Sequence, residues 1–275
     1  MSAAHDALGH LMAWADWRSL AVLRRNALVY FRNWKTAFLP PAMEPVVFFL
    51  AFGLGLSGYV GGLDWEGERL SYTAFVAPGL IAYTAFGTPY YEALYSAYVR
   101  MFFQKTWDGI LATQVELPHL VWGEVLWAAA RGFMNTAIVC LVLAAFDAAG
   151  MVELHTAQLL WMPPLAFLAG LAFAAFALIF TALVPAIDHM NYPVFLLGIP
   201  LSLISNTYFP LETERPWLRV LIDANPLYHL AETCRWLLVR GEPGPHLGPL
   251  ALSAGVLLVV SIVAATRLTA RRVLG

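Results

Sequence analysis

Residues 159–184 read LLWMPPLAFLAGLAFAAFALIFTALV, and no charged side chain interrupts them. A helix needs about 20 mainly apolar residues to cross the hydrocarbon core of a bilayer. This stretch exceeds that minimum, so it predicts a membrane-spanning helix that tilts or protrudes. The whole chain has the same character, because 60% of its residues are hydrophobic and 12% are charged. Soluble domains carry about 45–50% apolar and about 25% charged residues.

Five more apolar segments of spanning length flank this stretch and bring the predicted spans to six. They cover residues 38–58, 73–98, 121–146, 191–209 and 248–268. The predicted fold class is therefore all-α, a polytopic membrane protein with six transmembrane helices. Its transmembrane domain occupies 38–268, between an N-terminal segment, 1–37, and a short tail, 269–275.

Lysine and arginine predict the orientation of these spans, because cytoplasmic loops carry an excess of them. With both termini in the cytoplasm, the inner segments hold ten of the sixteen basic residues and the outer segments hold five. The remaining one, Arg131, lies inside a span. We therefore expect both termini on the cytoplasmic side.

Three polar segments predict helices that do not cross the membrane. Residues 13–35 repeat apolar side chains on one face and arginine on another, which favours a helix in the headgroup plane over a cytosolic helix packed on a partner. The repeats are Trp14, Ala21 and Leu28, and Arg18, Arg25 and Arg32. Residues 104–116 predict a short cytoplasmic helix, either packed under the bundle or offered to a partner. Trp107, Ile110 and Leu111 share its face, and Asp108 suits its N-terminus.

The third such segment, 210–240, predicts two short amphipathic helices on the outer side. Asn225 and Pro226 are typical of the cap and first turn of the second helix. Both helices are long enough to dip partly into the outer leaflet.

Four ionisable residues fall within predicted spans, where a charge is costly unless it is paired or hydrated. They are Glu44, Glu92, Glu124 and Arg131. Glu92 and Arg131 lie at similar depths, at about 1.5 Å per residue, so we predict that they pair. A structural ion pair is favoured over a proton or substrate site.

Tyrosines gather on the second predicted span, among them Tyr83, Tyr91 and Tyr95. They fit either an aromatic belt at the membrane surface or a substrate path that stacks on sugars and acyl chains. The sequence leaves these two interpretations equal.

Several functions are excluded by missing motifs. The chain lacks GxxxxGK[ST], so any ATP and Mg²⁺ must bind to a second polypeptide. HExxH and Cys/His metal spacings are absent, which predicts no metal site. The GLSG at 55–58 resembles a serine-protease motif, but no histidine lies well inside a span to activate the serine. We therefore predict no catalytic residues, and a net charge of −2 gives no sign of nucleic-acid binding.

The order of these features resembles the permease subunits of type-2 ABC exporters, over about residues 34–268. The sharpest likeness is in FFQKTWDGILATQVEL (102–117), GEVLWAAARG (123–132), SNTYFPLETERPWLRV (205–220) and NPLYHLAETCRW (225–236). Within these exporters the chain is most similar to nodulation-factor (lipo-oligosaccharide) export permeases. Daunorubicin-type drug-resistance permeases are related more distantly.

The resemblance implies a homodimer in the bacterial inner membrane, in contact with lipid, joined to a dimer of cytoplasmic ATPase subunits. Residues 104–116 would hold the coupling helix, with Trp107, Asp108, Ile110 and Leu111. Residues 210–240 would be re-entrant helices that close the outer gate, formed by Asn206, Tyr208, Phe209, Asn225 and Pro226. Asn206 departs from the glycine of many relatives, which implies a stiffer gate.

The implied path runs between the first, second and fifth spans of two copies. Its cargo would be an amphiphile such as a lipid-linked or lipo-oligosaccharide, or alternatively a drug. An intramembrane enzyme lacks a catalytic set here. An ion-coupled carrier would need acids near mid-membrane, whereas these lie toward the cytoplasm.

The predicted topology can be tested with a reporter fused after Gly275. Because six spans return the chain to its starting side, a cytoplasmic reporter should be active there. Activity of a periplasmic reporter at the same position would contradict the six-span arrangement.

Overall fold

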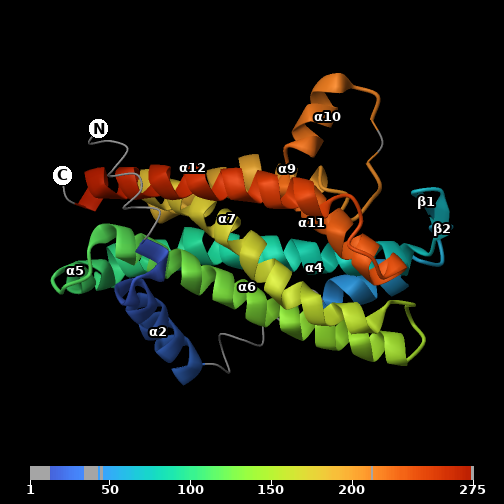
Figure 1. Cartoon of the computed structure of the whole chain (residues 1–275), viewed down its shortest axis with the longest axis horizontal. Helices are drawn as coiled ribbons and strands as arrows, with labels where there is room; N and C mark the ends of the chain where they lie inside the picture. Colours follow the sequence, from blue (N-terminus) through green and yellow to red (C-terminus); the bar gives the residue numbers. More distant parts are fainter. Residues whose placement is uncertain (1–12, 34–42, 44–45, 212, 274–275) are drawn as a thin grey trace.

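The computed structural model describes residues 13–33, 43, 46–211 and 213–273. Within these residues the molecule is a bundle of long helices that run side by side along its longest axis (Figure 1). The four longest are α4 (Tyr72–Tyr91), α6 (Leu117–Ala148), α7 (Met162–Leu183) and α12 (Leu247–Val273). The segment that opened the sequence analysis forms α7, which packs against the other three.

The contacts of α7 are made by small side chains. Its buried face includes Ala166, Ala169, Gly170, Ala174 and Ala177. Alanine and glycine let helix axes approach closely, which membrane bundles use in place of a hydrophobic driving force. α7 is therefore the close-packed centre of the bundle.

Three stretches of the described chain are long and apolar enough to cross a membrane. They are Leu117–Ala148, Thr156–Leu183 and Leu247–Val273, and they correspond to the third, fourth and sixth predicted spans. The second predicted span is helical as well. There α4 continues through two π-helical segments, η3 (Glu92–Ser96) and η4 (Val99–Phe103).

Of the other two predicted spans, the first lies partly outside the described residues and the fifth is shorter than predicted. The first, 38–58, is described only at Met43 and from Val46 onward, where η2 (Phe49–Leu54) is π-helical. The fifth, 191–209, was predicted too long, because its helix ends at Leu203. The segments that build it are η6 (Ile187–Met190), α8 (Asn191–Pro193), η7 (Val194–Gly198) and α9 (Ile199–Leu203).

Side-chain hydroxyls explain why the fifth helix stops early. Ser205 donates to the Leu201 carbonyl and Thr207 donates to the Ser202 carbonyl, so carbonyls at the helix end are satisfied without another turn. Asn206 then takes a left-handed conformation, with φ 52°. This conformation favours glycine, and asparagine is one of the few other residues that adopt it readily.

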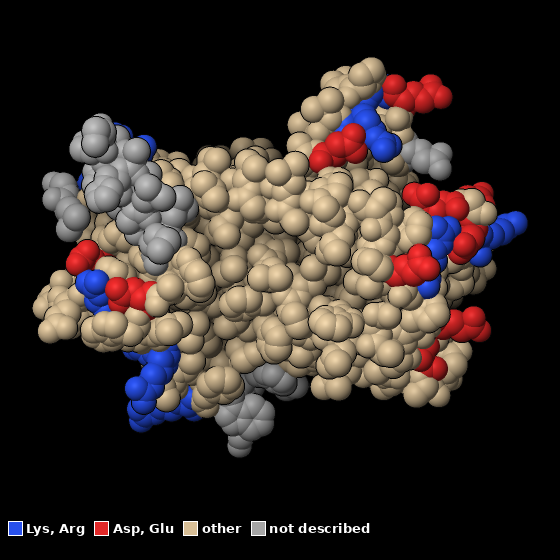
Figure 2. Space-filling model, in the orientation of Figure 1, with Lys and Arg blue, Asp and Glu red and all other residues tan. Residues whose placement is uncertain are grey.

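Polar elements lie at the two ends of the bundle. One end carries α5 (Thr106–Leu111), α2 (Trp17–Arg32) and the last turn of α12 (Figure 1). The opposite end carries α10 (Pro216–Asp223), α11 (Pro226–Arg235) with η8 (Trp236–Arg240), and a β-hairpin. On the face shown in Figure 2, charged side chains gather toward these ends and leave an uncharged band between them.

The hairpin corrects the all-α prediction. Strands β1 (Leu63–Trp65) and β2 (Glu68–Leu70) pair antiparallel, with Leu63 opposite Leu70. Both turn residues have positive φ, 49° at Glu66 and 78° at Gly67, as a type I′ turn requires. Glu-Gly is a weaker signal for this turn than Asn-Gly or Asp-Gly, and the prediction missed it.

α2 lies against α6 through a narrow face of small and polar residues. Ser19, Val22, Asn26 and Tyr30 are buried there. The apolar residues predicted to face lipid point away from the bundle, and Leu28 is 62% exposed. The helix begins at Asp16, whose carboxylate accepts hydrogen bonds from the side chain and backbone N–H of Arg18. These bonds lower the pKa of Asp16 to about 2, so the cap stays ionised at physiological pH.

Replacing Gly123 with alanine should loosen α2 from α6. A β-carbon at Gly123 would lie 2.4 Å from Val22 Cβ and 2.9 Å from the Ser19 carbonyl oxygen, so one helix must move. Overpacking of this kind costs about 1–3 kcal/mol, and we expect a lower unfolding temperature in detergent. Gly255→Ala is the matched control, because no atom lies within 4 Å of its β-carbon. An equal fall in both variants would contradict this contact.

Candidate functional site

Four charged side chains meet inside the bundle near its α5 end. Glu92 opens η3 and Arg100 lies on η4, while Glu124 and Arg131 lie on α6. Glu92 accepts hydrogen bonds from Arg131 and, at 2.9 Å, from Nη1 of Arg100. Arg100 Nε also lies 3.1 Å from each oxygen of Glu124. Two positive and two negative charges are thus paired with one another, which is the condition for burying them.

The structure brings Glu92 and Arg131 together as the sequence analysis predicted, but it adds Arg100. Sequence reasoning assigned Arg100 to a cytoplasmic segment, because the predicted second span, 73–98, ended at Tyr98. The helix continues to Phe103 instead. Side chains on a helix point toward its N-terminus, so Arg100 reaches back to Glu92. Of the other acids predicted within spans, Glu124 belongs to this network, and Glu44 lies outside the described residues.

Two tryptophans complete the network. Trp127 donates its indole N–H to Glu92 at 2.9 Å, and Trp107 donates to Glu124 at 3.1 Å. Trp107 is 1% exposed. Of the two arrangements left open for this helix, the structure shows the ring of Trp107 packed under the bundle and not offered to a partner. That ring packs inward and fastens α5 to α6.

α5 itself is shorter than the predicted 104–116 and begins differently. Lys105 precedes it with φ 51°, a left-handed turn that starts the helix at Thr106. Asp108 does not cap the helix. It lies exposed in the first turn, 3.9 Å from the Lys105 amine. Ile110 and Leu111 are half-buried against the core, so the outward surface of α5 consists of Asp108, Gly109 and Ala112.

The predicted path tyrosines lie along the boundary between α4 and the fifth span. Tyr83 faces Tyr208, with ring centroids 5.9 Å apart, and Tyr208 faces Phe48 at 6.0 Å. This aromatic group joins the first, second and fifth predicted spans. Nearer the α5 end, the Tyr95 hydroxyl donates to Asn191 at 3.4 Å, while Tyr91 lies edge-on to Tyr90 at 5.5 Å.

Two of the predicted outer-gate residues, Asn206 and Asn225, each hold a turn by hydrogen bonds, and Phe209 is 56% exposed. Asn225 caps α11 as predicted, accepting from the Leu227 N–H at 3.0 Å, and Pro226 is buried in the first turn. The Asn225 amide also donates to Ser205 at 2.7 Å. Asn206 accepts from the Leu211 N–H at 2.7 Å. The loop after α9 is therefore tied to the start of α11.

A second buried ion pair, Glu232 with Arg235, was missed by sequence reasoning. The sequence placed both residues on the polar side of an amphipathic helix. In the structure this side is turned inward, and Arg235 is 0% exposed. Arg235 donates to the Asn206 carbonyl at 2.6 Å and stacks on Phe75, and Glu232 accepts from Trp65 of the hairpin at 2.9 Å. Its only sequence signal is an acid and a base three residues apart on one helix.

Within the described residues, no three His, Cys, Asp or Glu side chains cluster as a metal site. Cys140 and Cys234 are both free thiols. The site therefore consists of two buried ion-pair networks, one at each end of the bundle, with an aromatic group between them. This arrangement joins the helices, so a displacement of one can be transmitted to the next.

Comparisons with known proteins agree with this geometry. A family described as ABC-2 type transporter matches residues 19–239. Nodulation protein J of Rhizobium leguminosarum bv. viciae is 31% identical over 258 residues, which cover 93% of this chain and 95% of that protein. Nodulation protein J of Rhizobium meliloti is 30% identical, covering 90% of this chain and 89% of that protein. The inner membrane transport permease YadH of Escherichia coli is 28% identical over 84% of each chain. This chain is an integral membrane protein that belongs to the ABC-2 type transporter family.

Proposed function

We propose that this chain is the permease subunit of an ATP-driven exporter that moves an amphiphile outward across the bacterial inner membrane. ATP and Mg²⁺ bind to a separate cytoplasmic ATPase dimer. The family supports the transport role. The likeness to nodulation-factor export permeases favours a lipid-linked or lipo-oligosaccharide as the cargo.

The observation that carries the proposal is the connection from α5 to the bundle. α5 lies at one end of the molecule (Figure 1), and a hydrogen bond from its Trp107 to Glu124 joins it directly to the ion network. From Glu124 the contacts continue to Arg100 and then to Glu92. A displacement of α5 by the ATPase would thereby reach both α6 and the continuation of α4.

Docking and transmission are separate tasks in this arrangement. The exposed residues Asp108, Gly109 and Ala112 form the surface that meets the ATPase. The buried Trp107 passes the movement inward.

The cargo path is proposed to follow the aromatic group of Phe48, Tyr83 and Tyr208. Flat ring faces suit sugars and acyl chains, because they offer a large apolar area. The neighbouring fifth span leaves apolar side chains uncovered, with Phe195 62% and Leu196 68% exposed. A second copy of the chain and lipid are the proposed partners of that surface.

The orientation follows from this assignment. The α5 end faces the cytoplasm with both termini, and α10 and α11 face outward as the gate. Six spans remain the proposed number. Three are described helices long and apolar enough to cross a membrane, and the other three, 38–58, 73–98 and 191–209, rest on the hydropathy of the sequence.

Replacing Trp107 with phenylalanine should uncouple transport while the ATPase stays bound. The ring is kept, but Glu124 loses an indole N–H, and a hydrogen bond to a charged group contributes about 1.5–3 kcal/mol. In vesicles with the ATPase, we expect lipo-oligosaccharide export per ATP to fall about tenfold or more.

Asp108→Lys is the contrasting variant, because its side chain is exposed. It should weaken ATPase association and leave the stability of the permease unchanged. Normal export by Trp107→Phe would refute the transmission role. ATP-dependent export of daunorubicin in place of lipo-oligosaccharide would assign the chain to drug efflux.

Arg100→Ala should destabilise the protein more than Arg131→Ala. Arg100 bridges Glu92 and Glu124, so its loss leaves Glu124 buried without a cation. Breaking a buried pair costs about 3–5 kcal/mol. After loss of Arg131, Glu92 still keeps Arg100 and Trp127. The measurement is the folded yield and unfolding temperature in detergent, and a larger loss for Arg131→Ala would contradict the described network.

A further inference from the structure

A polar cavity of about 320 Å³ lies between α2 and the bundle, beside the ion network. α2 contributes Arg25, Asn26 and Tyr30 to its wall, and the bundle contributes Glu92, Arg100 and Arg131. The coupling and gating roles proposed above do not use this cavity. The residues that line the cavity determine which kind of ligand would bind there.

Three buried donors of this wall lack a hydrogen-bond partner among the described residues. They are the Asn26 amide nitrogen, the Tyr30 hydroxyl and Nε of Arg131. Asn26 is 3% and Tyr30 is 7% exposed, so bulk water does not satisfy them. A buried donor without an acceptor is costly and rare. All three belong to residues of one cavity wall, so an acceptor placed at this wall would be favourable.

The charge of the wall is positive once its ion pairs are counted. Glu92 and Glu124 are matched by Arg100 and Arg131. Arg25 is a third cation, and within the described chain it contacts only neutral acceptors, Asn26 at 2.9 Å and Thr106 at 3.5 Å. Among the described residues Arg25 makes no ion pair, and Glu124 attracts it only from a longer distance.

A ligand that suits this cavity wall accepts several hydrogen bonds and carries negative charge. A phosphate group meets both needs, since its oxygens accept from guanidinium, amide and hydroxyl donors, and arginine recognises it well. We infer that this cavity binds a phosphate group, presented by the headgroup of an anionic phospholipid. α2 brings the donors to the place where such headgroups lie, because its outward apolar residues suit the membrane surface.

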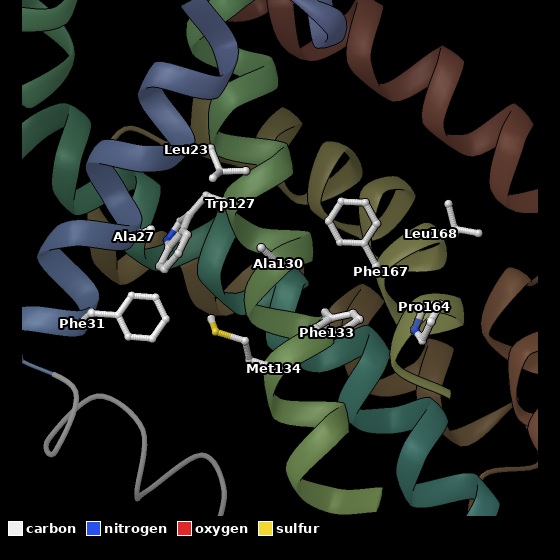
Figure 3. A pocket seen from close by; sticks show the side chains of 10 residues that line it. All are labelled: Leu23, Ala27, Phe31, Trp127, Ala130, Phe133, Met134, Pro164, Phe167 and Leu168. Atoms are coloured by element: carbon white, nitrogen blue, oxygen red, sulfur yellow. The ribbon is translucent and has the colours of Figure 1, made fainter. Parts of the chain in front are cut away.

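The neighbouring groove supplies the apolar half of a lipid site. It has a volume of about 620 Å³ and is lined by α2, α6 and α7 without a polar lining atom (Figure 3). Leu23, Ala27 and Phe31 approach it from α2, and Phe133 and Phe167 face them from the bundle. Trp127 lines both spaces. Acyl chains fit this apolar groove, whereas a free phosphate ion would gain no favourable contact from it.

The test is lipid retention by the purified full-length chain, measured by native mass spectrometry without the ATPase. Phosphatidylglycerol and diacylglycerol with the same acyl chains are compared, so that the headgroup phosphate is the difference. The wild type should retain phosphatidylglycerol about tenfold better or more, on the scale of charged hydrogen bonds. Arg25→Gln should lose most of this preference.

Asn26→Asp is the second variant, because it keeps the shape and places a carboxylate beside Arg25. It should retain the fold and lose phosphatidylglycerol binding. Arg24→Gln is the matched control, with the same charge change on an exposed position of α2. Inorganic phosphate is titrated separately, and competition by it supports the phosphate chemistry. If inorganic phosphate binds and phosphatidylglycerol is not retained, the cavity is a site for a free anion instead of a lipid. Equal retention of both lipids, or equal losses in Arg24→Gln and Arg25→Gln, would overturn the site.

Discussion

The pairing of Glu92 and Glu124 with Arg100 and Arg131 is the constraint on which the α5 end of the bundle depends. A charge in hydrocarbon is costly by itself, and Glu124 would bear that cost if Arg100, which pairs with it, were removed. The four residues come from α6 and the π-helical continuation of α4, so these helices must keep their relative positions. The wide turns of η3 and η4 lie where the charges meet, as such turns often do at functional sites.

The opposite end repeats this solution with different elements. Arg235 and Glu232 hold the hairpin through Trp65, the loop after α9 through Asn206, and α4 through Phe75. Both ends therefore use an arginine to join segments far apart in the sequence. Arginine suits this task because its planar group donates in several directions at once. The band between the ends is closed mainly by apolar packing, with a few hydrogen bonds such as those from Tyr90 to the Pro193 carbonyl and from Asn135 to Thr88.

The sequence predicted those features that depend on local composition. Hydropathy located α6, α7 and α12, because each has the length and apolar content of a span. The Asn225 cap was also predicted, since capping depends on two adjacent residues. The hairpin was missed because Glu-Gly is an uncommon turn pair. Spacing put Trp107 on the correct face of α5, but it cannot say whether that face turns inward. Arg100 and Arg235 were read as loop or surface charges, because their partners lie on other elements or on a face whose burial only the fold decides.

The small residues of α7 have a mechanical consequence. Where alanine and glycine let helices pack this closely, the interior has low compressibility and resists changes of shape. α4, α6, α7 and α12 thus act as a rigid frame. The fifth span is a continuous helix over residues 191–203 that contains Pro193 and Pro200, and much of its surface is uncovered. A segment with so little buried surface costs less free energy to bend than the close-packed frame does.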